Sequence, residues 1–291
     1  MFDEIEILRR LPALLPLNGR ISVGAGDDCA VINISGECQL LAAADQVIEK
    51  VHFLSETPPR LVGRKLMNRN LSDIAAMGGT PLTALLTVAA GGKDARWIEE
   101  LISGAAEAGK VFDVPVCGGD TAALPVDGAA ASLTILGEVP AGTAVLRSGA
   151  RPGNGVFVTG RIGNSFLSEH HLTFTPRLTE GAFLRPLASA MIDISDGLLL
   201  DAIRLADASG VSIMLDPDSV PLRAGAAAPG AFSDGEDYEL LFTSDHDIPQ
   251  MTPASMTVIT RIGQVIPRGK APVVTPDHQP FTMENSGYVH R

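Results

Sequence analysis

The chain has 291 residues, of which 45% are hydrophobic, and its formal net charge is −12. This length is sufficient for two domains of ordinary size. The acidic balance argues against nucleic acid and against an anionic membrane as partners, because both are negatively charged. An acidic protein that handles phosphates needs metal ions between the two sets of negative charge.

The cysteine content and the hydrophobicity pattern indicate the compartment. Three cysteines are present, Cys29, Cys38 and Cys117, and none belongs to a CxxC pair, so a disulfide framework is not expected. The first residues, MFDEIEILRRLPALLP, are acidic and contain prolines, unlike a signal peptide. No apolar run approaches the roughly 20 residues needed to cross a bilayer. We therefore expect a cytoplasmic protein.

The first half of the chain predicts strands paired in hairpins and two helices. CAVINI and CQLLAAAD are strand-like and are separated by the turn signal SGE. PRLVGRKLMNRNLSDIAAMG predicts a helix that ends at Gly78, and PLTALLTVAA predicts a strand. DARWIEELISGAAEAGKVF predicts a second helix with Asp94 as its N-cap. VPVCGGD predicts a short strand entering a Gly-Gly turn, and AASLTILGEV predicts a further strand.

A stretch rich in glycine and proline, GEVPAGTAVLRSGARPGNG, predicts a domain boundary. We place the domains at residues 1–147 and 148–291. The second half begins with the strand GVFVTG, continues through a loop-rich stretch, and predicts a helix from about Ala182. AMIDISDGLLLDAIRLADASG predicts a strand, a turn and a helix that ends at Gly210. The later runs VSIMLD, YELLFTS, SMTVITRIGQV and APVVT are strand-like. The predicted fold class is therefore α+β with two domains.

Acidic residues gather in glycine-containing turns, most of them beside apolar strands. They are Asp27, Asp28, Asp45, Asp73, Asp120, Asp193, Asp196, Glu236 and Asp237. Carboxylates at strand ends suit Mg²⁺ held jointly with nucleotide phosphates, and glycine allows a phosphate to approach closely. Any one such turn is also an ordinary turn or helix N-cap, so the metal interpretation depends on their number. The GxxxxGK[ST] loop, the protein-kinase motifs and the HExxH motif are absent, which argues against those enzyme classes.

Ten segments in order carry a resemblance to a known family: GDDCAVI, AADQVIEKVHF, NLSDIAAMGGTP, CGGDTA, LRSGARPGN, TPRLTEG, IDISDGLLLDA, ASGV, GEDYELLF and GYVH. From about Asp3 to Tyr288 the chain resembles the thiamine-monophosphate kinase family, within the superfamily of aminoimidazole-ribonucleotide synthetase and selenophosphate synthetase. The resemblance implies that superfamily's two-domain fold. It also implies a homodimer whose N-terminal domains pair into a shared β-barrel, with ATP between the domains.

The resemblance also implies the reaction and its residues. The γ-phosphate of ATP would pass to the phosphate of thiamine monophosphate, with Mg²⁺ neutralising charge and without a covalent enzyme intermediate. Matching motifs place metal ligands at Asp27, Asp45, Asp73, Asp120, Asp193 and Asp196, ATP contacts at Gly119, Asp120, Arg147 and Ser195, and acceptor contacts at His52, Glu236 and Tyr288. Asp73 and Arg147 are the catalytic residues of this assignment, and Asp28 is expected to support the turn or an outer-shell water.

Four features depart from the family pattern. Ala44 stands where a Ser or Thr is usual, Lys50 replaces a glycine, and Ile102 replaces a nucleotide-contacting Tyr. The segment near 165–175 is short, so a family helix is expected to be missing or reduced there. These departures leave two alternatives open: a related ATP-dependent kinase with another small phosphorylated acceptor, and a non-catalytic nucleotide-binding paralogue.

Overall fold

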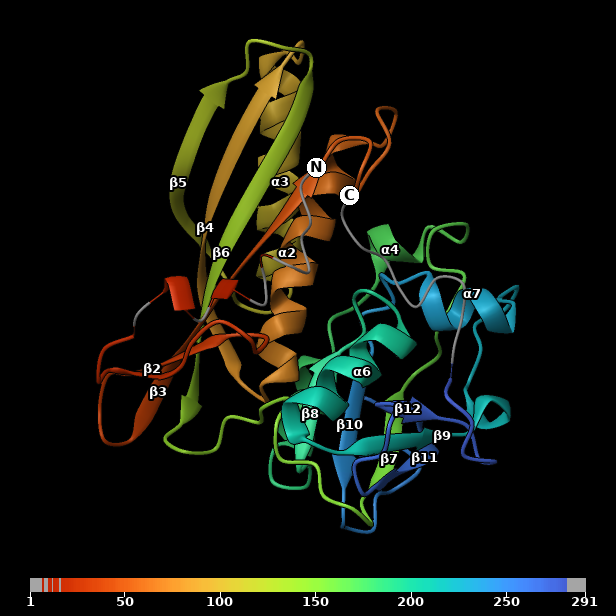
Figure 1. Ribbon diagram of the computed structural model, residues 1–291. Coiled ribbons are helices and arrows are strands. Elements are labelled where there is room, and N and C mark those ends of the chain that lie inside the picture. The colour runs from red at the N-terminus through yellow and green to blue at the C-terminus, as the bar shows by residue number, and fades with distance from the viewer. Residues whose placement is uncertain (1–6, 8–9, 12, 16, 282–291) are drawn as a thin grey trace.

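Two six-stranded sheets, each covered by helices, make up the protein (Figure 1). The computed structural model describes residues 7, 10–11, 13–15 and 17–281. The predicted acceptor contact Tyr288 lies outside the described residues. Within them, every helix is too short or too polar to serve as a membrane span.

The first sheet is mixed and carries two long helices. Its elements are β1 (Ile21–Val23), β2 (Ala30–Asn33), β3 (Cys38–Ile48), α2 (Pro59–Ala76), β4 (Thr80–Gly91), α3 (Ala95–Lys110), β5 (Val116–Ala123) and β6 (Gly128–Pro140). The strand order is β1-β2-β3-β6-β4-β5, and all neighbours are antiparallel except β4 and β5. The helices α2 and α3 lie against one face of the long strands (Figure 1).

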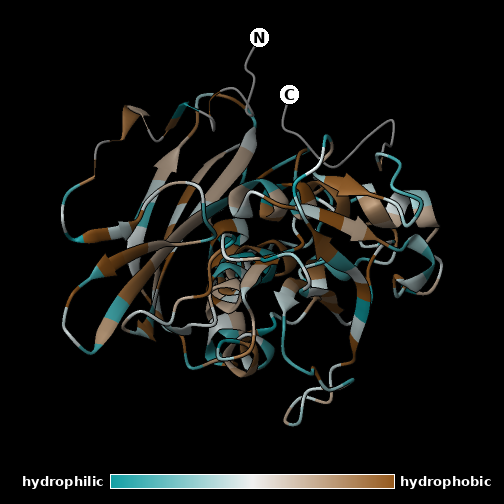
Figure 2. Ribbon diagram, turned by 60° about the horizontal axis from the view of Figure 1, so that its bottom comes forward, coloured by the Kyte–Doolittle hydropathy of each residue, from teal (hydrophilic) through white to brown (hydrophobic). Residues whose placement is uncertain are grey.

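Alternating burial along β4 and β6 shows that one face of this sheet packs on the helices. Glycines bring α2 and α3 close together, because a Cβ at Gly63 would lie 1.9 Å from the Leu101 carbonyl oxygen, and one at Gly104 would lie 2.1 Å from the Arg60 carbonyl oxygen. Figure 2 shows the hydrophobic colour mainly on strands and helices and much of the hydrophilic colour in loops. The core of this half therefore lies between the sheet and the helix pair.

The second sheet is mostly antiparallel. Its elements are β7 (Gly155–Thr159), α4 (His170–Thr173), α5 (Leu178–Leu184), β8 (Ala190–Asp193), α6 (Leu198–Ser209), β9 (Ser212–Leu215), the 3₁₀ turn η1 (Pro217–Ser219), α7 (Ala228–Ser233), β10 (Leu240–Ser244), β11 (Ile259–Ile266) and β12 (Val273–Val274). The strand order is β12-β9-β11-β7-β10-β8, with only β12 and β9 parallel. A second apolar core lies between this sheet and α6.

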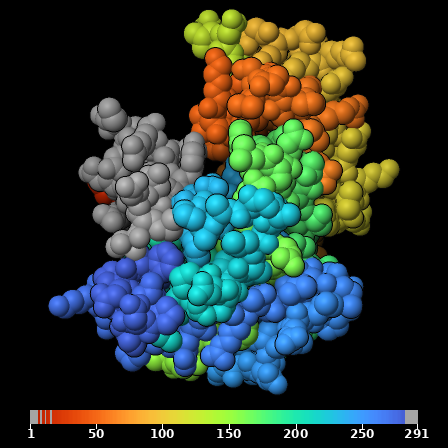
Figure 3. Space-filling model, turned by 90° about the vertical axis from the view of Figure 1, so that its right-hand side faces the viewer, coloured from red at the N-terminus to blue at the C-terminus, as the bar shows by residue number. Residues whose placement is uncertain are grey.

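The C-terminal end of α2 connects the two halves. Ala75 and Ala76 of α2 share a buried cluster with Leu184 of α5 and with Met191 and Phe242 of the second sheet. In Figure 3, green surface near residues 160–180 lies between orange surface of the first half and blue surface of the second. One helix therefore contributes side chains to the core of the first half and to this third cluster between the halves.

Most predicted elements are confirmed, and two are corrected. Asp94 accepts a hydrogen bond from the Trp97 amide as the N-cap of α3, and Gly210 ends α6 in a left-handed conformation. The predicted Gly-Gly turn is wrong, because Gly118 and Gly119 lie inside β5, where pairing with β4 continues the strand. The helix predicted from about Ala182 instead begins at Leu178 and ends at Leu184.

Candidate active site

Three carboxylates from distant parts of the sequence meet where the two halves join. Asp28 precedes β2, Asp73 lies in the last turn of α2, and Asp193 ends β8. One oxygen from each lies within 4.8 Å of the others. The Ser72 hydroxyl donates a 2.6 Å hydrogen bond to Asp193, so adjacent residues of α2 reach toward the second sheet. The site is therefore built from both domains.

The electrostatics of this group favour a bound cation. Burial raises the pKa of Asp73 and of Asp193 well above the usual value, and repulsion from neighbouring carboxylates, including Asp28, raises both further. The Asp28 Oδ2 atom is buried and has no hydrogen-bond partner among the described residues. Oxygen-only donors at this spacing fit Mg²⁺, which would relieve the repulsion and would give the Asp28 oxygen a partner.

The guanidinium of Arg147 directly contacts this group of carboxylates. Its Nη2 atom lies 2.7 Å from Asp28 Oδ1, and its Nε atom is buried without a partner in the described part of the chain. Its carbonyl oxygen accepts a hydrogen bond from the Ser209 hydroxyl at the end of α6. Arg147 therefore adjoins the carboxylates with an unused donor, which suits an anionic ligand.

Asp27 has surroundings different from those of Asp28. Its carboxylate accepts hydrogen bonds from the backbone amides of Asp28 and Arg147, at 3.1 and 3.2 Å. Burial, followed by the charge of Asp28, raises its pKa to about 6. The compact group of three contains Asp28 and not Asp27, whereas the sequence favoured Asp27 as the ligand and assigned Asp28 to the turn.

The turn between β8 and α6 places Ser195 and Asp196 at a helix N-terminus. Both backbone amides donate to Asp201 Oδ2 at 3.1 Å. Arg204 contacts Asp196 at 2.5 Å and Asp201 at 2.8 Å. Burial raises the pKa of Asp201 to about 7. Two side chains of α6, Asp201 and Arg204, therefore hold the turn in place. The Asp196 carboxylate already forms an ion pair with Arg204.

A second polar network contains two predicted acceptor residues. Glu236 lies 2.7 Å from the ammonium group of Lys65 and 3.2 Å from His171 of α4. Lys65 also donates to the carbonyl oxygen of His52 at 2.6 Å, and the His52 ring accepts a hydrogen bond from the Ile48 amide. His52 and Glu236 are thus brought together through Lys65.

The charges in this network are strongly perturbed. Burial opposes the ionisation of Glu236, but the hydrogen bond from His171 and the charge of Lys65 outweigh it and lower its pKa to about 2. Burial lowers the pKa of Lys65 to about 8, against the opposing charge of Glu236. Glu236 is therefore a carboxylate at neutral pH.

Asp45 and Asp120 are outside the group of three, although the charge of Asp45 contributes to the raised pKa of Asp73. The Asp45 carboxylate is paired with Arg69 at 2.6 Å. Asp120 is exposed on β5 and makes no ion pair with the part of the chain that the structure describes. A Cβ at Gly119 would lie 1.6 Å from the Leu86 carbonyl oxygen. Packing against β4 is therefore sufficient to explain the glycine at this position.

The departures from the family pattern also have structural positions. Lys50 has a φ of 66°, in the left-handed region that favours glycine. Ile102 packs against the core of the first half. Between β7 and α5 the described chain has a single short helix, α4, of four residues.

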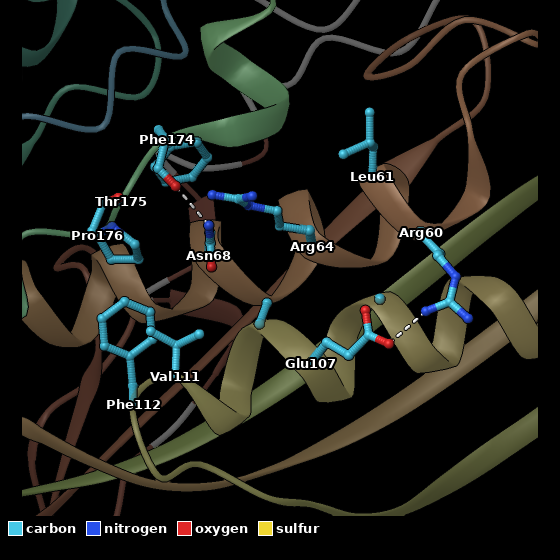
Figure 4. A pocket seen from close by; sticks show the side chains of 12 residues that line it. Arg60, Leu61, Arg64, Asn68, Glu107, Val111, Phe112, Phe174, Thr175 and Pro176 are labelled. Atoms are coloured by element: carbon cyan, nitrogen blue, oxygen red, sulfur yellow. Dashed lines mark hydrogen bonds and ion pairs between the residues drawn. The ribbon is translucent and has the colours of Figure 1, made fainter.

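A separate pocket lies between α2, α3 and the segment after α4 (Figure 4). Phe112, Val111 and Pro176 border it, Asn68 donates to the Phe174 carbonyl at 2.7 Å, and Arg60 pairs with Glu107. None of the predicted site residues within the described part of the chain lines this pocket.

Sequence reasoning missed several charged residues of the site: Lys65, Arg69, His171, Asp201 and Arg204. The signal that could have identified these residues is a charged side chain among apolar residues of a predicted helix, because a buried charge needs a partner. Only the folded chain reveals those partners.

Comparisons with known proteins agree with this fold. Residues 26–139 match the family model described as AIR synthase related protein, N-terminal domain. The solved structure of "AaThiL complexed with AMPPCP and TMP" has a TM-score of 0.85 and 29% identity, covering 99% of this chain and 97% of that one. Thiamine monophosphate kinase from Aquifex aeolicus has a TM-score of 0.78 and 28% identity, covering 94% and 96%. Residues 26–139 are therefore an AIR synthase related N-terminal domain.

A curated relative then specifies the family. The thiamine-monophosphate kinase of Salmonella typhimurium is 33% identical over 306 residues, covering 93% of this chain and 92% of the relative. The chain belongs to the thiamine-monophosphate kinase family.

Proposed function

We propose that this protein transfers the γ-phosphate of ATP to the phosphate of thiamine monophosphate and so forms thiamine diphosphate. The proposal is supported above all by the three carboxylates Asp28, Asp73 and Asp193, which both domains contribute and which adjoin Arg147. The family relatives are named for this activity, and one similar structure is described as a complex with AMPPCP and TMP.

The residues have distinct parts in this proposal. Asp28, Asp73 and Asp193 would hold Mg²⁺, which neutralises phosphate charge during transfer. Arg147 binds and orients phosphate oxygens through donors that Asp28 does not use. Gly119, Asp120, Ser195 and Asp196 are proposed for the nucleotide and its metal, and Asp27 and Asp45 retain a predicted part in metal binding. His52 and Glu236 are proposed for the acceptor.

A direct assay tests the proposal. Purified protein is incubated with ATP, Mg²⁺ and thiamine monophosphate, and the diphosphate product is measured by chromatography. Asp73→Asn should reduce turnover by at least about 10²-fold, since it removes charge stabilisation at the reacting phosphates, while Asp113→Asn, an exposed matched change, should leave it intact. No product, together with ATP consumption on another phosphorylated heterocycle, would assign a different acceptor. Absence of ATP binding at millimolar Mg²⁺ would exclude a kinase.

We further propose a cytoplasmic homodimer formed through the first sheet. The face of β4 opposite the helices exposes Leu82 and Leu85, which are 40% and 43% accessible. An exposed apolar sheet face is a typical protein interface. Light scattering should give twice the chain mass, and Leu85→Glu should give the monomer mass. A monomeric wild-type protein would refute the proposal.

A further inference from the structure

The pocket between α2, α3 and the segment after α4 is lined by a residue with an unpaired polar atom. Asn68 is 3% exposed, and its side-chain nitrogen donates to the Phe174 carbonyl oxygen at 2.7 Å. That contact fixes the orientation of the amide, because only its nitrogen can donate. The Oδ1 atom is buried and has no hydrogen-bond partner among the described residues. Figure 4 shows this oxygen turned away from the Phe174 carbonyl, toward the side of the pocket where Phe112 lies.

The free oxygen of Asn68 indicates what a ligand must offer. A buried acceptor without a hydrogen bond is unfavourable, and native structures contain few of them. Because this acceptor belongs to a residue that lines a pocket, a bound molecule can reach it. A ligand with an N–H group would supply the missing hydrogen bond.

The charged residues of the pocket favour an anion. Arg64 of α2 donates from Nη2 to the Thr173 carbonyl oxygen at 2.7 Å and makes no ion pair within the part of the chain that the structure describes. Arg60, by contrast, is paired with Glu107 at 2.5 Å. Two arginines and one glutamate give the lining a formal charge of +1, in a chain whose net charge is −12. The remaining donors of Arg64 therefore suit a single anionic group.

The size and the apolar lining of the pocket limit the body of the ligand. Phe112, Phe174 and Pro176 contribute apolar surface, and the volume of about 290 Å³ is at the small end of ligand pockets. This space suits a molecule of one or two rings and is small for a nucleotide. Arg64 and Asn68 are four residues apart on α2, so their Cβ atoms are roughly 5–6 Å apart on one helix face. One planar molecule can therefore contact both side chains.

We propose that this pocket binds a small planar heterocycle that carries one anionic group and one N–H group. The anionic group contacts Arg64, the N–H group donates to Asn68 Oδ1, and the ring lies against Phe112. The site is distinct from the group of three carboxylates, none of which lines the pocket. It also lies on the helix side of the first sheet, away from the β4 face through which we propose the homodimer.

Three related probes test the site in ligand-observed NMR titrations of the intact protein. Indole-3-acetate has a ring N–H and a carboxylate, indole-3-acetamide lacks the charge, and 1-benzofuran-3-acetate has an oxygen in place of the N–H. Indole-3-acetate should bind with a Kd on the order of 1 mM, as expected for a ligand of this size. Each of the other two should bind at least about fivefold more weakly. Equal affinities of the three probes, or no binding of indole-3-acetate, would overturn the proposal.

A matched pair of substitutions assigns the binding to this pocket. Arg64→Gln removes the unpaired cation and should weaken indole-3-acetate binding at least about fivefold, with little effect on indole-3-acetamide. Arg96→Gln makes the same change at a side chain of α3 that is 83% exposed and outside the pocket lining, and it should leave both affinities unchanged. Equal losses in the two variants would mean attraction to positive surface in general and would contradict the proposal.

Two features keep the result decisive. The comparison of probes uses the wild-type protein, so it stands even if Arg64→Gln fails to fold, which thermal melting verifies. Binding is measured without turnover, so failure of the thiamine monophosphate assay would affect the proposed function and leave these affinities interpretable.

Discussion

Asp27 and Asp28 show how adjacent carboxylates acquire different environments. Asp28 is 8% exposed and joins Asp73 and Asp193, whereas Asp27 is tied to backbone amides. The chain bends at Asp28, just before β2, and only this member of the pair joins the group of three. The sequence identified the pair as important, but which member is inward depends on contacts made by residues far along the chain.

Two matched substitutions distinguish the neighbours. Asp28→Asn removes a charge from the group of three, so we expect at least about a 10-fold loss of Mn²⁺ affinity, the order seen when even supporting contacts of a metal site are lost. Asp27→Asn keeps an acceptor for the backbone amides and should weaken binding less. Calorimetric titration with Mn²⁺ measures both. A larger loss in the Asp27 variant would favour the assignment made from sequence.

Lys50 adopts a backbone conformation that its side chain disfavours. Its φ is 66°, its amide donates to the Phe53 carbonyl at 2.7 Å, and its side chain is exposed. Left-handed geometry costs a residue other than glycine about 1–2 kcal/mol, part of which the greater freedom of unfolded glycine offsets. Lys50→Gly should therefore raise the free energy of unfolding by up to about 1 kcal/mol. Urea denaturation tests this.

The matched control for that change is Lys270→Gly. Lys270 is also exposed, but it lies outside the set of residues with positive φ. Its replacement should leave stability unchanged or lower it slightly, because glycine adds unfolded-state entropy without relieving strain. Equal effects of the two substitutions would contradict the strain at Lys50.

At the scale of elements, the contact of α2 with α3 depends on missing side chains. A Cβ at Gly104 would lie 2.1 Å from the Arg60 carbonyl oxygen, a backbone atom that cannot move away alone. Gly104→Ala should lower the free energy of unfolding by about 1–3 kcal/mol, through overpacking. In a free helix the same change is stabilising by up to about 1 kcal/mol, so the sign itself is diagnostic.

Denaturation midpoints of the wild-type protein, Gly104→Ala and Glu99→Ala test the contact between α2 and α3. Glu99→Ala on the exposed side of α3 should shift the midpoint little, in contrast to Gly104→Ala. A stabilised Gly104 variant would show that the two helices are farther apart than the structure has them.

Local patterns predicted most elements because capping and alternation are local properties. The Asp94 cap and the Gly210 end follow from single residues, and β4 follows from its apolar run. The run through Gly118 and Gly119 was misjudged as a turn, because it remains a strand only through its pairing with β4. Glycine signals a close approach, and the sequence does not identify the approaching group as backbone or ligand.

At the scale of the whole molecule, the site exists only where the two halves meet. Asp73 and Asp193 are 120 positions apart in the numbering, and Lys65 reaches Glu236 from the other half. Motif resemblance identified His52 and Glu236, but Lys65, between them, lies in a helix that reads as ordinary core. The acids stand out in the sequence, whereas their counter-charges emerge only in the fold, because pairing is a tertiary property.

The pH dependence of overall stability tests this packing at His170. Burial lowers the pKa of His170 to about 4, and the charge of Arg223 lowers it further, with smaller effects from Arg177 and His171. The unfolded chain protonates this residue near its ordinary value of 6.5, so it binds more protons than the folded chain between pH 6.5 and 4. The contribution of His170 is therefore fully present above pH 6.5 and is lost as the pH falls toward 4.

Replacing His170 should flatten that part of the stability profile. His170→Asn removes the titrating group, so the free energy of unfolding should fall less steeply between pH 6.5 and 4 than in the wild-type protein. The exposed His246→Asn change is the control and should preserve the wild-type slope. Urea denaturation at half-unit pH intervals measures the slopes. A wild-type slope in the His170 variant would mean that the ring is hydrated in solution. The contact of α4 with the segment before β10 would then be looser than the 3.2 Å approach of the His170 Nε2 atom to the Asp237 carbonyl indicates.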